Sequence, residues 1–198
     1  HGRSVQMLQG QEGSKDSESR RPLETALRAY LNAHSASASP RKHVAAGAKV
    51  LIYTPGVVGW GNRVQGLYTS LAMALLTNRT LLVDWTSPIP LTDLVTLNPA
   101  LQRLLLDADM TRQIAGLRSI NANAWDHVRG YNHFPEDVLK LGDIPSSWDA
   151  PVVHFSVGED WLPQILQNHY LKDDIIRVFG SDATRQWSER NLQLLAHE

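Results

Sequence analysis

The residues best suited to binding chemistry lie in the segment Gly59-Trp60-Gly61-Asn62-Arg63. Its two glycines predict a loop that can take positive φ and bring backbone close to a ligand. Apolar side chains then recur at steps of three and four, which predicts a helix after Gly61. Because helix N-termini favour anions, Asn62 and Arg63 in the first turn would complete an anion site. The alternative is that the glycines only make a tight corner and Arg63 is a solvated surface charge.

Two apolar segments are expected to position this candidate site. Residues 50–53 precede it and residues 80–83 follow the predicted helix, and both have the apolar, β-branched character of buried strands. Strand, glycine loop, helix and strand form a βαβ unit with parallel strands. Asp84 and Trp85 end the second strand. They are further binding candidates, because ligands bind at the carboxyl ends of parallel strands.

The dinucleotide fingerprint G-x-G-x-x-G matches this segment only in part. Gly59 and Gly61 occupy its first two positions, Val64 stands at the third, and the next glycine is Gly66. Asp84 mimics the acid that binds a ribose hydroxyl. An oxidoreductase that uses a nicotinamide or flavin cofactor therefore stays open as an alternative.

Two motifs flank the predicted helix: G-[aromatic or Leu]-G-[Asn/Asp]-[Arg/Gln] from Gly59, and R-x-L-x-[Val/Ile]-D from Arg79. Together they resemble the opening of the fucosyltransferase superfamily, which includes plant cell-wall, α1,6- and protein O-fucosyltransferases. Residues 155–163 are similar to a later strand of that family, which runs into a helix near a proline. The resemblance implies a two-lobed, metal-independent GT-B transferase that uses a nucleotide sugar.

The chain has 198 residues, of which about fifty form the predicted tail, so it has room for one such lobe. We expect a flexible tail or stem at 1–48, with a short helix at 22–34, and a Rossmann-like parallel sheet flanked by helices at 49–198. The resemblance implies transfer of fucose from GDP-fucose to a glycan or protein hydroxyl. This lobe would help to bind the acceptor and would contribute its glycine loop to the donor site.

The partners implied by the resemblance are GDP-fucose, a glycan or glycoprotein acceptor, and a second GT-B lobe that holds most of the donor. GDP-fucose is a substrate, and no cofactor is implied. The catalytic residues stay unassigned. A location in the Golgi or another secretory lumen is expected if an upstream segment tethers the enzyme.

Asp107 and Asp109 offer a different chemistry. A D-x-D pair at the end of a strand can hold a divalent metal and a sugar diphosphate, as in GT-A glycosyltransferases. Residues 99–106 are instead predicted as a helix, on which two such carboxylates diverge. The donor motif H-x-R-x-x-D is matched only partly from His127, with Asn132 in place of the acid. A metal-dependent GT-A transferase and a non-catalytic relative that binds a glycan or a partner therefore stay open as alternatives.

Beyond Trp85 the sequence predicts a third buried strand at 151–155 and a polar, aromatic loop at 121–135. The other predicted helices are 100–107, 111–117, 161–169, 172–179 and 183–196.

The composition limits the possible functions. A content of 42% hydrophobic residues permits a sizeable core, and a net charge of −1 argues against broad binding to nucleic acid. Cysteine is absent, which excludes disulfides and thiolate chemistry, and the histidines lack metal-site spacing. Asn78-Arg79-Thr80 is an N-glycosylation sequon in form, relevant in a secretory compartment.

Overall fold

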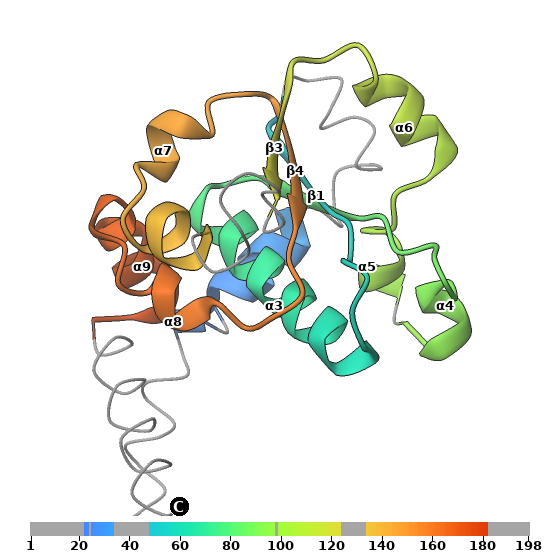
Figure 1. Ribbon diagram of the computed structural model, residues 1–198, viewed down its shortest axis with the longest axis horizontal. Coiled ribbons are helices and arrows are strands. Elements are labelled where there is room, and N and C mark those ends of the chain that lie inside the picture. Colours follow the sequence, from blue (N-terminus) through green and yellow to red (C-terminus); the bar gives the residue numbers. More distant parts are fainter. Residues whose placement is uncertain (1–21, 24, 34–47, 98, 124–133, 182–198) are drawn as a thin grey trace, which may run out of the picture.

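The computed structural model describes residues 22–23, 25–33, 48–97, 99–123 and 134–181. The strands of this part form one four-stranded parallel sheet in the order β2-β1-β4-β3 (Figure 1). They are β1 (Val50–Tyr53), β2 (Thr80–Val83), β3 (Ser119–Asn123) and β4 (Val152–Ser156). The parallel pair of β1 and β2 confirms the predicted βαβ unit, and β4 confirms the predicted third strand.

Each face of the sheet carries its own apolar layer. Leu51, Tyr53 and their neighbours in register belong to a large core with helix α3 (Trp60–Leu76) and helix α9 (Lys172–Phe179). Val50 and Ile52 point the other way and pack with residues of helix α6 (Ala108–Ile114). Successive side chains of a strand alternate between the two faces of a sheet. When helices cover both faces, both sets of side chains are therefore expected to be apolar. Figure 1 shows α6 and α9 on opposite sides of the strands.

The remaining elements are short. They are α4 (Leu91–Leu94), α5 (Pro99–Gln102), the π-helix η1 (Phe134–Lys140), α7 (Ile144–Ser147), α8 (Leu162–Ile165) and the 3-10 helix η2 (His169–Leu171). Buried Asn168 ties several of them together: its side chain accepts from the amides of Tyr170 and Leu171 and donates to the carbonyls of Leu139 and Gly142. Within the described residues, no helix combines the length and apolar character needed to cross a bilayer.

Four predictions of secondary structure differ from the structure. The helix predicted at 111–117 is α6, which spans Ala108–Ile114. Residues 119–123 form β3, although the sequence Ser-Ile-Asn-Ala-Asn looks like a loop, because β4 supplies the pairing for this polar edge strand. Helix α5 ends at Gln102, and Leu105 then pairs with Val83 in an isolated parallel bridge. The predicted helix at 161–169 stops at Ile165 and is followed by η2. The predicted helix at 183–196 lies outside the described residues.

The amino-terminal helix covers the outer side of β2. Residues 22–23 and 25–33 are helical, as predicted. The Tyr30 hydroxyl accepts from the amide of Leu81 at 2.6 Å and donates to the carbonyl of Arg79 at 3.2 Å. An edge strand otherwise leaves such amides unpaired, so Tyr30 supplies one of the bonds that a fifth strand would make. The helix expected within a flexible tail therefore packs against the lobe.

Arg79 stabilises the amino-terminal edge of the sheet through hydrogen bonds to backbone carbonyls. Its side chain is 2% exposed, and its Nη1 donates to the carbonyls of Val50, Ala150 and Pro151 at 3.0–3.3 Å. Its Nη2 donates to the carbonyl of Trp148. Burial lowers the pKa of Arg79, partly offset by Asp149. The arginine of the R-x-L-x-[Val/Ile]-D motif thus holds the starts of β1 and β4 together, at the edge opposite the candidate site.

Candidate functional site

Helix α3 begins one residue after Gly59, so the predicted glycine loop is wrong in its conformation. Gly59 is the N-cap, with φ −62° and ψ 162°, while Trp60 and Gly61 are already helical. In the described part of the chain, Gly180 is the glycine with positive φ. A Cβ at Gly59 or Gly61 would meet no atom within 4 Å. Packing of the described residues therefore does not require either glycine, and the backbone at the helix start is open to a ligand.

Packing does require Gly66, which lies further along α3. A Cβ there would lie 2.3 Å from the Val157 carbonyl oxygen and 2.7 Å from the Tyr53 hydroxyl. Tyr53 in turn donates to the carbonyl of Arg63 at 2.7 Å, and burial raises the pKa of its phenol. Gly66 therefore lets the helix lie directly on the carboxyl ends of β1 and β4. It performs the close-packing role of the third fingerprint glycine, two positions later than the fingerprint requires.

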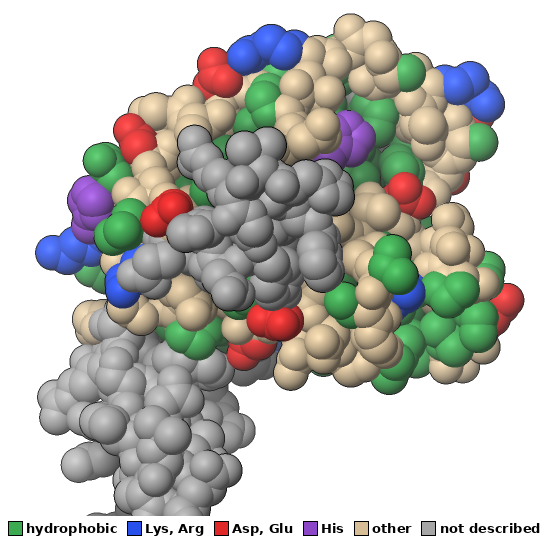
Figure 2. Space-filling model, viewed as in Figure 1, with side chains coloured by type: hydrophobic (Ala, Val, Ile, Leu, Met, Phe, Trp, Pro, Cys, Tyr) green, Lys and Arg blue, Asp and Glu red, His purple; other side chains and the backbone are tan. Residues whose placement is uncertain are grey.

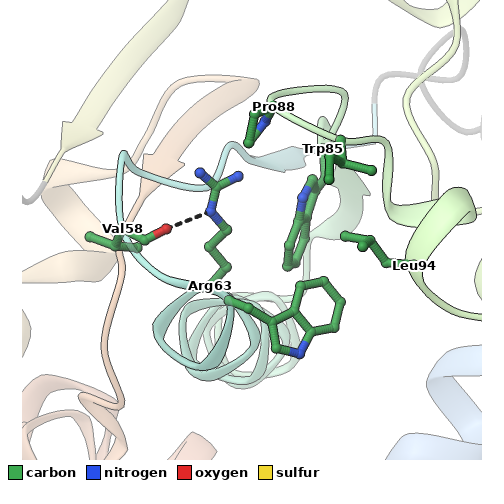
Figure 3. Close-up of a pocket in the computed structure, with 7 residues that line it drawn as sticks. Val58, Arg63, Trp85, Pro88 and Leu94 are labelled. Carbon is green, nitrogen blue, oxygen red and sulfur yellow. Dashed lines mark hydrogen bonds between the residues drawn. The ribbon is translucent and has the colours of Figure 1, made fainter.

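Arg63 links the two loops that follow β1 and β2. Its Nε donates to the carbonyl of Val58 at 2.8 Å, and its Nη1 donates to the carbonyl of Ser87 at 2.7 Å. The guanidinium carbon lies 5.9 Å from the centroid of the Trp85 ring, within cation–π range. In Figure 3 the Arg63 side chain extends between Val58 and Pro88, with the Trp85 indole opposite it. Arg63 is therefore held in place, and two of its five N–H groups are already used.

Trp60 and Trp85 form the floor of an open hollow beside Arg63. Their ring centroids are 5.1 Å apart, and Trp85 also makes an edge contact with Tyr53 at 6.5 Å. The hollow has a volume of about 210 Å³. Its lining consists of Val58, Trp60, Arg63, Trp85, Pro88, Ile89 and Leu94. Three of these seven lining residues, Trp60, Arg63 and Trp85, belong to the predicted binding segments.

The two tryptophans differ in what they offer to a ligand. Trp60 is 44% exposed, whereas Trp85 is 3% exposed and its Nε1 makes no hydrogen bond to any described residue. Apolar side chains surround the hollow, with Val57, Ile89, Leu94 and Val95 exposed at the surface. Figure 2 shows hydrophobic side chains gathered over the region where α4 lies in Figure 1. The site therefore combines an accessible aromatic face, one fixed cation and an apolar rim.

Two other predicted residues lie near this edge without joining the hollow's lining. Asn62 is exposed in the first turn of α3. Asp84 is half-buried directly after β2, and its amide donates to the carbonyl of Tyr53 at 2.8 Å. The parallel sheet thus brings Asp84 and the start of α3 to one edge, as predicted.

The loop after β4 packs against the loop after β1 beside the site, and it was not among the predicted binding residues. A Cβ at Gly158 would lie 2.9 Å from Cγ2 of Val58, so the two loops are in contact. Buried Thr69 of α3 donates to the carbonyl of Glu159 and accepts from the amide of Trp161. Asp160 accepts from the amide of Leu162 at 3.0 Å. The sequence signal for this arrangement is Gly158, in the loop after β4, where a side chain would collide with Val58 of the loop after β1.

Asp107 and Asp109 serve helix α6. The Asp107 carboxylate caps the helix by accepting from the amide of Met110 at 2.7 Å, and Asp109 pairs with Arg112. The short bridge of Leu105 does put the pair after extended backbone, contrary to the predicted helix. Within the described residues, no group of three His, Asp or Glu side chains is placed to hold a metal ion. His127, Arg129 and Asn132 lie outside the described residues.

Comparison with known proteins gives a match of fold. No protein-family model matches the chain, and no curated protein matches it. Among solved structures, it is similar to a mutant of the fucosyltransferase FUT1 of Arabidopsis thaliana in complex with GDP. The sequence identity is 22% and the TM-score 0.59. The match covers 82% of this chain and 42% of that chain, so this chain spans less than half of the FUT1 chain. The predicted fold, a Rossmann-like parallel sheet flanked by helices, is confirmed, and it matches part of the FUT1 fold.

Proposed function

We propose that this chain is the acceptor-side lobe of a GT-B glycosyltransferase that transfers fucose from GDP-fucose to a glycan or protein hydroxyl. The observation that carries the proposal is the hollow at the carboxyl edge of β1 and β2, where Trp60, Trp85 and Arg63 converge. The fold matches that of FUT1, which was solved with GDP. The motifs from Gly59 and Arg79 provide the fucosyltransferase resemblance in the sequence.

The hollow has the chemistry of a sugar site. The C–H faces of a pyranose ring are apolar and pack on an exposed aromatic face, while its hydroxyls need a few polar partners. Trp60 offers such a face, and the unused N–H groups of Arg63 offer donors to hydroxyl oxygens. We assign the hollow to one sugar ring of the acceptor.

The exposed start of α3 has the chemistry of a donor contact. The amides of Trp60, Gly61 and Asn62 precede the first intrahelical bond, which the amide of Arg63 makes to Gly59. No acidic side chain stands in this first turn. Free amides and the helix dipole favour a phosphate oxygen, so we assign this helix start to the diphosphate of GDP-fucose. A second lobe, which in GT-B enzymes faces this edge, would hold the rest of the nucleotide.

The proposal includes a secretory location, in the Golgi or another lumen, and a reaction that uses no cofactor or metal. Asp107 and Asp109 are engaged by α6, which disfavours the GT-A alternative. The second candidate is a non-catalytic relative that binds a glycan in the same hollow. This second candidate is favoured by the hydrogen bonds from Arg63 to the carbonyls of Val58 and Ser87, which leave its guanidinium only partly free to bind the sugar donor.

Substitution of Trp60 tests the acceptor assignment in the natural full-length protein. Trp60→Ala removes the exposed ring, and we expect the acceptor KM to rise about tenfold, equivalent to about 1.4 kcal/mol, while the KM for GDP-fucose stays within about twofold. Tyr68→Ala is the matched control, because Tyr68 is an exposed aromatic residue of the same helix outside the hollow's lining. An acceptor KM that Trp60→Ala leaves unchanged would refute the assignment. Glycan binding without any transfer would select the non-catalytic candidate.

A further inference from the structure

The sequon Asn78-Arg79-Thr80 lies where helix α3 ends and strand β2 begins. It is the single Asn-x-Ser/Thr sequence, with x other than proline, in the 198 residues. Asn78 takes φ 49°, and the amide of Arg79 donates to the carbonyl of Ala74 at 2.9 Å. This is the bond from C″ to C3 of a Schellman motif, with Asn78 at the left-handed C′ position. The turn thus places an asparagine at a left-handed position, a backbone conformation that asparagine adopts more readily than most other non-glycine residues.

The three residues of the sequon differ sharply in exposure. Asn78 is exposed, whereas Arg79 and Thr80 are each 2% exposed. The amide of Thr80 is bonded to the carbonyl of Lys49, and the Arg79 side chain is held by carbonyls at the starts of β1 and β4. An enzyme that reads Asn-x-Thr as an accessible segment can therefore reach it only before β2 joins the sheet. Once the chain is folded, a group on the Asn78 side chain remains outside the core.

The position is also remote from the candidate site. Asn78 borders a second hollow of about 220 Å³ at the amino edge of the sheet, with Lys49, Trp148 and Asp174 in its lining. The hollow of Trp60 and Trp85 lies at the carboxyl edge, beyond the full length of the parallel strands. A bulky group on Asn78 is thus compatible with both the fold and the proposed acceptor site.

We propose that Asn78 carries an N-linked glycan, attached to the nascent chain before β2 pairs with β1. The donor is an oligosaccharide linked to a lipid diphosphate. The Asn78 Nδ2 forms a bond to the anomeric carbon of the first sugar, the bond from that carbon to the diphosphate oxygen breaks, and Nδ2 loses one proton. The lipid diphosphate leaves with the bonding electron pair. The inference rests on the proposed function only for the secretory location.

The test is expression of the chain in eukaryotic cells behind a cleavable signal sequence, which supplies the location independently. We expect peptide N-glycosidase to lower the mass of the secreted chain by one glycan and to convert the linked asparagine to aspartate in the peptide that contains Thr80. Thr80→Ser is the matched control, because it keeps the sequon and should keep the glycan.

Two variants should lose the glycan by different routes. Asn78→Gly removes the acceptor amide and tolerates the positive φ, while Thr80→Val keeps Asn78 and removes the hydroxyl of the sequon. If either one fails to be secreted, the other still gives a result. A secreted wild-type chain with unmodified Asn78, or a glycan retained by either variant, would overturn the inference. Neither result bears on fucose transfer, so failure of this inference is distinguishable from failure of the proposed function.

Discussion

Gly66 allows a sharp test of how helix α3 is positioned. In Gly66→Ala the new methyl group would lie 2.3 Å from the Val157 carbonyl oxygen, so helix and loop must separate by about 1.1 Å to reach an ordinary contact of 3.4 Å. Overpacking of this kind costs about 1–3 kcal/mol, whereas alanine favours a helix interior over glycine by about 0.5–1 kcal/mol. We therefore expect a net loss of roughly 1–2 kcal/mol in the free energy of unfolding.

Gly61→Ala is the matched control on the same helix. No atom lies within 4 Å of its added Cβ, so only the helix preference remains and the variant should gain up to about 1 kcal/mol. Urea unfolding of both variants, followed by far-UV circular dichroism, measures the difference. Addition of Tyr53→Phe to Gly66→Ala should not restore stability, since it leaves the closer contact to Val157 and also removes the hydrogen bond from Tyr53 to the Arg63 carbonyl. Equal stability of Gly66→Ala and Gly61→Ala would refute the close-packing role.

Three further predictions concern the groups that hold the site and the sheet. Arg63→Met removes the hydrogen bonds to the carbonyls of Val58 and Ser87 and should lower the free energy of unfolding by about 1–3 kcal/mol. Proteolysis of the loop at 84–90 should also become faster. An unchanged proteolysis rate would instead support a solvated Arg63. Arg79→Met leaves buried carbonyls without a hydrogen-bond donor and should lower the free energy of unfolding, measured in urea, by roughly 3 kcal/mol or more. A decrease below about 1 kcal/mol would contradict the structural role of Arg79. Burial raises the pKa of Tyr53, so the unfolded state loses its phenolic proton first and stability should fall as the pH rises above about 10. Tyr53→Phe should weaken that fall, leaving the part due to Tyr30, whose pKa burial also raises.

The sheet could be predicted where the sequence is strongly patterned. Mostly apolar runs at 50–53, 80–83 and 151–155 predict buried strands, and β1, β2 and β4 confirm them to within one residue. Strand β3 could not be predicted, because its polar residues gain their conformation from pairing with β4 and not from a local preference. The bridge of Leu105 to Val83 escaped prediction for the same reason, since long-range pairing leaves no local signal.

Three of the residues that line the candidate site, Trp60, Arg63 and Trp85, could be predicted, but the geometry of the site could not. The segment from Gly59 and the pair Asp84-Trp85 meet at one edge because parallel strands align their carboxyl ends. The sequence could not reveal that the carbonyls of Val58 and Ser87 hold Arg63, because backbone acceptors occur at every residue. A glycine inside a helix was the one available signal for Gly66, since glycine in that position is unfavourable unless close packing requires it.

The central claim is tested most directly by a turnover assay of the natural full-length protein with a panel of GDP- and UDP-sugars and glycan acceptors, with nucleotide release and product mass as the readouts. We predict acceptor-dependent release of GDP from GDP-fucose, addition of one fucose to the product, and the same rate in the presence of a metal chelator. Acceptor-dependent turnover of a UDP-sugar that the chelator abolishes, or no turnover of GDP-fucose with any acceptor that the protein binds, would contradict it.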